Sequence, residues 1–177
     1  MVDASTIAEG WKDARVAPDN PVYECEIQAR LRDVNLGGHV DNVEAIRVLD
    51  EARIQLLRFA PMPDLSGERP GLMGRVPDGI PELVGAQRID YHAEMRWVPF
   101  QPFLVRMWVS HVGGSSFSIA SELRVVADHP PALVAETSLV LWDHSAAAPW
   151  RMSDEVRADL AAYAGPPVEL RERPSVR

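Results

Sequence analysis

The residues best suited to chemistry lie together in one short stretch of the chain. Two carboxylates, an amide and an imidazole occur there, at Asp33, Asn35, His39 and Asp41. Carboxylate and imidazole side chains are common proton donors and acceptors in catalysis. The stretch also precedes a predicted helix, and free N–H groups at a helix N-terminus stabilise negative charge. This combination predicts a site where a proton moves while negative charge develops on a nearby oxygen.

Two elements must position this stretch. Residues 22–32 alternate apolar and polar side chains, which is the pattern of a half-buried strand. Gly37 and Gly38 then permit a tight loop. Residues 41–60 contain neither Gly nor Pro and repeat apolar side chains every three or four positions, which predicts an amphipathic helix. The apolar positions of this helix are Val43, Ile46, Leu49, Ala52, Leu56 and Phe59.

The helix has clear start and stop signals. Asp41 and Asn42 are favourable capping residues, and Pro61 and Pro63 stop the helix. Residues 61–79 are then rich in Pro and Gly. We expect an irregular excursion there, either a lid or a loop that contacts a second copy of the chain.

The second half of the chain predicts antiparallel strands with no helix between them. Residues 113–115, Gly-Gly-Ser, predict the turn of a hairpin. Ser153 and the two acids after it predict the start of a short helix that runs to about Tyr163. The order of elements favours an α+β domain whose antiparallel sheet wraps around one long helix. The four strands expected after that helix are residues 88–97, 103–112, 117–126 and 133–142.

Length and composition fit one globular domain. The chain has 177 residues, of which 46% are hydrophobic and 25% charged, as is usual for a compact soluble protein. We divide it into an N-terminal arm (residues 1–21), a single domain (residues 22–164) and a loose C-terminal tail (residues 165–177). With no run of apolar residues that could span a membrane and no leader pattern, we expect a cytoplasmic protein that does not bind membranes.

Charge and cysteine content exclude further classes. A net charge of -8 argues against a nucleic-acid surface, which needs clustered Lys and Arg. Cys25 is the only cysteine, so the chain can form no intrachain disulfide, and its place on the apolar side of the predicted strand indicates a small buried residue rather than a nucleophile. We expect no metal site, because the remaining histidines lack ligand spacing. They are His92, His111, His129 and His144.

The order of the residues at 32–42 is more informative than the residue types alone. Their sequence RDVNLGGHVDN leads into LDEAR at 49–53. This resembles the hot-dog-fold acyl-CoA thioesterases, in the branch that includes 4-hydroxybenzoyl-CoA thioesterase and the plant acyl-carrier-protein thioesterases. Their signature is DxDxxGHVNN at the start of the central helix. The resemblance continues through IDY at 89–91, GSSF at 114–117 and VLWD at 140–143, and covers residues 23–163.

The resemblance implies a hot-dog fold and hydrolysis of a thioester. Negative charge then builds on the carbonyl oxygen, and the backbone N–H of Asn42, with those of Val40 and Asp41, is the implied oxyanion site. Gly38 lets the substrate come close. Coenzyme A enters as part of the substrate rather than as a separate cofactor. The residues assigned to its binding are Gly38, Val40, Ser115 and Ser116.

The chain departs from the signature at its second Asp, which is Asn35 here. The family uses that carboxylate as a nucleophile or as the base that activates water, and an amide can do neither. We take Asn35 and His39 as the pair involved in catalysis. Asp33, Asp41 and Glu51 are the other candidates. Their alternatives are structural: Asp33 caps a turn, and Glu51 pairs with Arg47 or Arg53 on the helix surface.

Three functions fit this pattern. The leading hypothesis is hydrolysis of an acyl-CoA or acyl-carrier-protein thioester by water activated near Asn35 and His39. The first alternative is a non-catalytic acyl-thioester binding module that lost its carboxylate. The second is an enoyl thioester hydratase, ranked lower because Asp33 and His39 are one residue too far apart for its dyad. We expect a homodimer or a dimer of dimers, and we expect one or two strand arginines to meet the coenzyme phosphates. Those arginines are Arg88, Arg96, Arg106 and Arg124.

Overall fold

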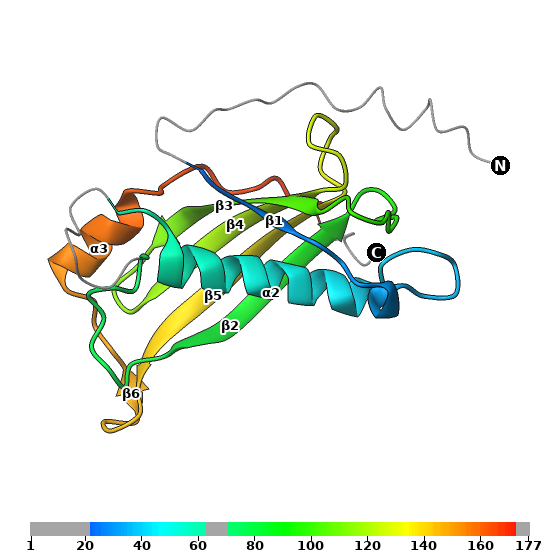
Figure 1. Cartoon of the computed structure of the whole chain (residues 1–177). Coiled ribbons are helices and arrows are strands. Elements are labelled where there is room, and N and C mark those ends of the chain that lie inside the picture. The colour runs from blue at the N-terminus through cyan, green and yellow to red at the C-terminus, as the bar shows by residue number, and fades with distance from the viewer. Residues whose placement is uncertain (1–21, 63–70, 173–177) are drawn as a thin grey trace, which may run out of the picture.

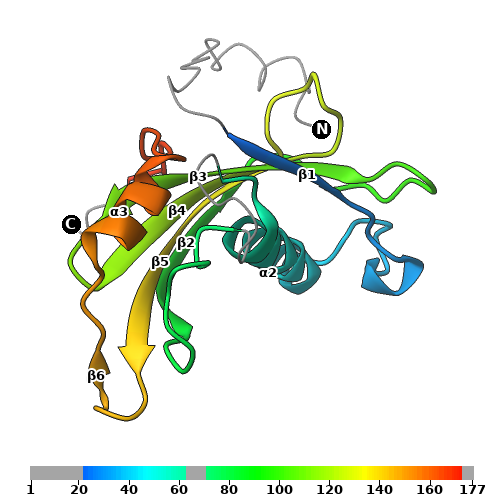
Figure 2. The same ribbon diagram turned by 60° about the vertical axis from the view of Figure 1, so that its left-hand side comes forward.

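One antiparallel sheet wraps around a long helix in the computed structural model, which describes residues 22–62 and 71–172 (Figure 1). The strands follow the order β1-β3-β4-β5-β2, and the helix α2 (Asn42–Phe59) lies on the concave side of the sheet (Figure 2). The predicted α+β architecture is confirmed. The predicted arm, residues 1–21, lies outside the described residues. The other elements are β1 (Tyr23–Ile27), η1 (Leu31–Asp33), β2 (Glu82–Tyr91), β3 (Phe103–Val112), β4 (Ser116–Arg124), β5 (Leu133–Asp143), β6 (Ala148–Pro149) and α3 (Asp154–Ala161).

Helix α2 forms where it was predicted, and its buried face overlaps the predicted one at Leu49, Ala52 and Leu56. Asp41 is its N-cap, and the Asp41 carboxylate accepts a 2.9 Å hydrogen bond from the Val43 amide. Val43 and Phe59, both predicted to face the core, are 51% and 64% exposed. The sheet instead packs on a stripe that contains two alanines, because small side chains let the helix approach the sheet closely. The buried residues of α2 are Ala45, Val48, Leu49, Ala52, Leu56 and Leu57.

The first strand is shorter than predicted. It ends at Ile27, and the chain turns into η1, where Leu31 is 69% exposed. The Asp33 carboxylate accepts a 2.7 Å hydrogen bond from the Arg30 amide and so stabilises this turn. A local side-chain acceptor of this kind competes with strand pairing. The alternation at residues 22–32 therefore predicted a strand correctly only up to Ile27.

Strand β2 is displaced from its predicted position at residues 88–97. It runs from Glu82 to Tyr91, and the chain leaves the sheet where the amides of His92 and Ala93 both donate to the carbonyl of Ala132. Alternation was absent before residue 88 because β2 is an edge strand that is largely exposed on both faces. Alternation after Tyr91 reflects a loop in which Met95 is buried in the core while its neighbours Glu94 and Arg96 are exposed.

The remaining predictions for the second half are confirmed. The turn at residues 113–115 joins β3 to β4, and the Ser153 hydroxyl accepts from the Val156 amide at the start of α3. The described part of the predicted excursion, residues 71–79, is irregular and packs at the C-terminal end of α2, where the Met73 amide donates to the carbonyl of Leu57.

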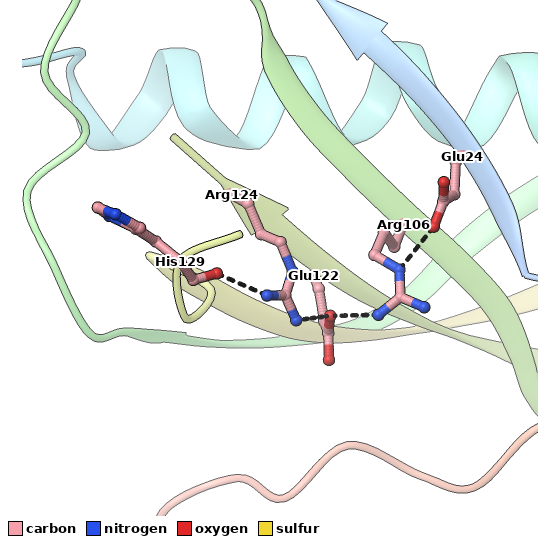
Figure 3. Close-up of polar contacts among 5 residues, drawn as sticks. All are labelled: Glu24, Arg106, Glu122, Arg124 and His129. Carbon is pink, nitrogen blue, oxygen red and sulfur yellow. Dashed lines mark hydrogen bonds and ion pairs between the residues drawn. The ribbon is translucent and has the colours of Figure 1, made fainter. Parts of the chain in front are cut away.

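The outer face of the sheet carries an ion-pair network (Figure 3). Arg106 contacts Glu24 and Glu122 at 2.9 and 3.2 Å, and Arg124 contacts Glu122 at 2.8 Å. Side chains alternate across a strand, and Val105 and Met107 on either side of Arg106 are buried in the core. The network therefore faces away from α2.

Residues 165–172, expected to begin a loose tail, make hydrogen bonds with the sheet. The Gly165 amide donates to the carbonyl of Val109, and Trp108 Nε1 donates to the carbonyl of Pro166 at 2.5 Å. Farther along, the Arg171 amide donates to Asp90 Oδ2 at 2.5 Å. This part of the chain therefore contacts β3 and the end of β2.

Candidate functional site

The loop between η1 and α2 is closed by its own backbone. Val34 and Val40 form an antiparallel bridge, and the Asn35 amide donates to the carbonyl of His39 at 2.8 Å. Gly38 has a φ of 80°, a left-handed conformation that favours glycine. The loop is therefore a small hairpin that leads directly to the start of α2.

The side chain of Asn35 holds this hairpin together. Its Oδ1 atom accepts hydrogen bonds from the amides of Gly37 at 2.9 Å and His39 at 3.3 Å. A Cβ atom placed on Gly37 would lie 3.2 Å from Asn35 Oδ1 and 3.8 Å from His39 Nδ1. Asn35 and His39, predicted as a pair, thus lie on the same side of the loop. An aspartate at this position could accept the same two hydrogen bonds.

The carboxylates of Asp33 and Asp41 both act as local caps. Asp33 accepts from the Arg30 amide and lies 3.5 Å from Arg32 Nε, whereas Asp41 accepts from the Val43 amide. Capping hydrogen bonds of this kind stabilise helix starts and turns. The structural alternative that was considered for Asp33 from the sequence therefore describes its contacts.

His39 has a carboxylate partner that the sequence did not suggest. Its Nε2 atom lies 3.3 Å from Glu94 Oε2, and the same oxygen contacts Arg96 Nη2 at 3.0 Å. The contact exists because the loop pairs with the segment after β2, where the Val40 amide donates to the carbonyl of Met95 at 2.8 Å. Only this tertiary pairing brings Glu94 to His39, so no local pattern could have identified it.

Two of the three amides predicted for the oxyanion site are already in use. The Val40 amide donates to Met95, and the Asp41 amide donates to the carbonyl of Asp33 at 2.9 Å. The first hydrogen bond within α2 is made by Ala45, which donates to the carbonyl of Asp41. The Asn42 amide precedes that bond, and within residues 22–62 and 71–172 it is the member of the predicted set that has no hydrogen-bond acceptor.

Tyr91 also reaches the start of α2. Its hydroxyl donates to the carbonyl of Asn42 at 3.3 Å. Burial and, to a smaller degree, the nearby Asp41 carboxylate raise the pKa of Tyr91 above its ordinary value. The phenol therefore keeps its proton at neutral pH. From the sequence, Tyr91 entered only as part of the IDY resemblance, without a chemical role.

Glu51 lies farther along the same helix. It follows Asn42 by nine residues, which places it ~14 Å along the helix axis. Arg47 and Arg53, its possible partners, contact Glu44 and Asp50 instead.

Glu51 acts electrostatically on Cys25. Burial, with a smaller contribution from the Glu51 charge, raises the pKa of Cys25 to about 11. The thiol is therefore protonated at neutral pH, which agrees with the interpretation of Cys25 as a packing residue.

Ser115 and Ser116 lie at the other end of the sheet. Tyr91 pairs with Leu133, which pairs with Leu123 on β4, and Ser116 is seven residues from Leu123 along that strand. At the rise of an extended strand, this separation is ~23 Å. Within one chain, the structure therefore does not bring these serines to the helix N-terminus.

Of the four arginines predicted to lie on strands, Arg96 is the one that pairs with the loop, although β2 ends before it. Arg106 and Arg124 belong to the network on the outer face (Figure 3), and Arg88 Nη2 donates to the carbonyl of Arg171. Arg96 forms a bridge with His39, and its side chain is 71% exposed. It is therefore the arginine placed to meet a charged group of a ligand at the loop.

Two open cavities lie at the far end of α2 from the loop. Their volumes are about 460 and 420 Å³, and both are lined by residues 77–80. Within residues 22–62 and 71–172, no three His, Cys, Asp or Glu side chains gather in a way that would hold a metal ion. In the same residues, no helix is long and apolar enough to cross a membrane.

Comparisons with known proteins agree with this architecture. The sequence profile of the thioesterase-like superfamily matches residues 29–160, most of the chain. A search of curated protein sequences found no match. The solved structure of a predicted thioesterase from Bacillus stearothermophilus is similar, with a TM-score of 0.64 and 18% identity over 84% of this chain and all of that one.

Two further solved structures are named for their ligands or substrates. A 1,4-dihydroxy-2-naphthoyl-CoA thioesterase from Synechocystis has a TM-score of 0.62 and 16% identity, over 80% of this chain and 96% of that one. A thioesterase from Thermus thermophilus, complexed with coenzyme A and Zn, has a TM-score of 0.59 and 21% identity, over 84% and 98% of the two chains. The sheet wrapped around α2 is thus the hot-dog fold, and the chain belongs to the thioesterase-like superfamily.

Proposed function

We propose that this protein hydrolyses acyl thioesters at the N-terminus of α2. The observation that carries the proposal is the position of the His39 imidazole, paired with Glu94, three residues before the available amide of Asn42. A base and a donor for developing negative charge are the two groups that ester-type hydrolysis needs. Membership of the thioesterase-like superfamily supports the same reaction.

The chemistry follows from these two groups. The imidazole takes a proton from water, and the water oxygen attacks the carbonyl carbon. The carbonyl oxygen becomes negative and accepts a hydrogen bond from the Asn42 amide. The carbon–sulfur bond then breaks, the imidazolium returns its proton to the leaving thiolate, and a carboxylic acid and a thiol are released.

We propose coenzyme A as the thiol of the substrate, with an acyl carrier protein as the alternative carrier. The similar proteins from Synechocystis and Thermus thermophilus are named with coenzyme A. The exposed Arg96 beside His39 supplies positive charge that suits a phosphate.

A second candidate function rests on Asn35. This residue stands where the resembling enzymes carry a carboxylate, and its Oδ1 atom is occupied by two loop amides. A protein that binds acyl thioesters without hydrolysing them fits that observation.

Release of thiol from a panel of acyl-CoA and acyl-carrier-protein substrates distinguishes the two functions. We expect turnover with at least one short, long or aromatic acyl group. Tight binding of acyl-CoA without thiol release across the panel would select the binding module. Formation of a hydroxyacyl product from an enoyl-CoA would select a hydratase.

We also propose that the protein forms a homodimer through β2, alone or within a dimer of dimers. β2 is a ten-residue edge strand, and it exposes Leu83 and Val84 by 42% and 51%. Long apolar edges are rarely left open in soluble proteins, because they pair with other strands. The opposite edge, β1, has only five residues.

Charge on this edge should separate the two copies. We expect sedimentation to give two or four times the mass of the chain for the native protein and a shift toward lower mass for the double variant Leu83→Lys, Val84→Lys. Val126→Lys is the matched control, because Val126 is 40% exposed outside β2. A native protein that is monomeric at micromolar concentration contradicts the proposal.

A further inference from the structure

The proposed oxyanion site has fewer backbone donors than its sequence implies. The Val40 and Asp41 amides donate to Met95 and Asp33, and the Val43 amide donates to the side chain of Asp41. Sites that stabilise a carbonyl oxygen during acyl transfer usually present more than one donor to it. With the Asn42 amide as one donor, a side chain near the start of α2 can supply a second.

Tyr91 presents a side-chain donor at the start of α2. Its hydroxyl lies 3.3 Å from the carbonyl oxygen of Asn42, on the same residue whose amide is available. Tyr91 is the last residue of β2, so its side chain reaches the start of α2 from the sheet, whereas the loop leads into α2 along the chain. Both donors therefore lie at the first turn of α2.

The backbone of Tyr91 is held from two sides. Tyr91 pairs with Leu133 on β5, and Arg171 Nη2 donates to the carbonyl of Tyr91 at 2.9 Å. The neighbouring Asp90 carboxylate accepts from the Arg171 amide at 2.5 Å. A side chain on a backbone fixed in this way can direct its hydroxyl to one position, as a donor for a transition state requires.

The present acceptor of the Tyr91 hydroxyl is replaceable. Asn42 is the first residue of α2, and its carbonyl is also the acceptor for a later amide of the helix. The hydroxyl contact of 3.3 Å is long for an O–H donor. Rotation of the hydroxyl toward a substrate oxygen therefore loses only a weak bond.

We propose that the Tyr91 hydroxyl is the second hydrogen-bond donor to the thioester carbonyl oxygen, together with the amide of Asn42. Tyr91 is then a catalytic residue of the proposed hydrolysis, on which this inference rests. The raised pKa of Tyr91, caused by burial and by Asp41, keeps the donor proton in place at neutral and moderately alkaline pH.

Tyr91→Phe removes the donor and keeps the ring. We expect kcat to fall about tenfold, the value of one neutral hydrogen bond, while KM changes little. Tyr23→Phe is the matched control, since the Tyr23 hydroxyl contacts Gln55 on α2 rather than the loop, and it should leave kcat unchanged. If the native protein hydrolyses thioesters and Tyr91→Phe has the same kcat, the role of Tyr91 is overturned and the proposed function stands. Absence of hydrolysis in the native protein overturns the proposed function.

Two further measurements separate a donor from a structural role. An acyl-CoA thioether, which lacks the carbonyl oxygen, should bind equally to the native protein and to Tyr91→Phe, and weaker binding to the variant would mean that Tyr91 only shapes the site. A fluorinated tyrosine at position 91 keeps the shape but ionises at lower pH. The rate should then fall at the pH where that phenol loses its proton, and an unchanged pH profile overturns the proposal.

Discussion

His39→Gln should lower thioester turnover by about a hundredfold or more, because a positioned base typically contributes that much to catalysis. The glutamine amide can still donate to Glu94, which lies 3.3 Å from the imidazole, so the pairing between the loop and the segment after β2 should survive. The change therefore removes the base and keeps its surroundings. Thiol release at saturating substrate measures the effect.

Two further variants help to interpret the effect of His39→Gln. Glu94→Gln should reduce turnover by only a few-fold, since the imidazole remains and loses only its orienting charge. His129→Gln is the matched control, because His129 is exposed in the turn between β4 and β5 and contacts Arg124 through its backbone carbonyl alone. Full turnover in His39→Gln, with the fold intact, would remove His39 from the mechanism.

Asn35→Asp should raise turnover by about a hundredfold, the typical contribution of a positioned acid–base group. One carboxylate oxygen can accept the hydrogen bonds from the Gly37 and His39 amides, so the hairpin is retained. The other oxygen adds a negative charge on the side of the loop that carries His39. That carboxylate stands at the signature position of the resembling enzymes.

The double variant Asn35→Asp, His39→Gln shows how the new carboxylate acts. A gain that persists without the imidazole identifies the carboxylate as a base or nucleophile in its own right. A gain that disappears means that it works through His39. Asn35→Ala removes the acceptor for both amides, so it should lose activity because the loop is no longer held in its hairpin. No change in turnover for a folded Asn35→Asp would place the reacting carbonyl away from position 35.

The sequence predicted the loop and the helix of the site because their signals are local. Two glycines, the cap Asp41 and an unbroken helical pattern lie within a few residues of one another, and each forms the expected structure. The sheet around the helix followed from the same kind of periodicity. Its least regular member, β2, was displaced because an edge strand exposed on both faces shows no alternation.

The partners of the site could not be predicted in the same way. Glu94 reaches His39, and Tyr91 reaches Asn42, only after the chain has folded back across about fifty residues. The loss of the Val40 amide has a similar origin, since Val40 donates to a carbonyl of that returning segment, whereas the Asp41 amide is engaged locally by Asp33. Long-range pairing thus decided which groups of the signature remain available for chemistry.

The attachment of Arg171 to Asp90 sets an order of events during synthesis. The two residues are separated by eighty-one positions, so the contact that secures the end of β2 arrives after β3, β4, β5 and α3 have been made. Contacts of such long sequence separation form late in folding, because a large loop has to close first. A nascent chain would thus pair Tyr91 with β5 before Arg171 is available to hold the end of β2, and maturation of the site should lag behind the appearance of compact structure.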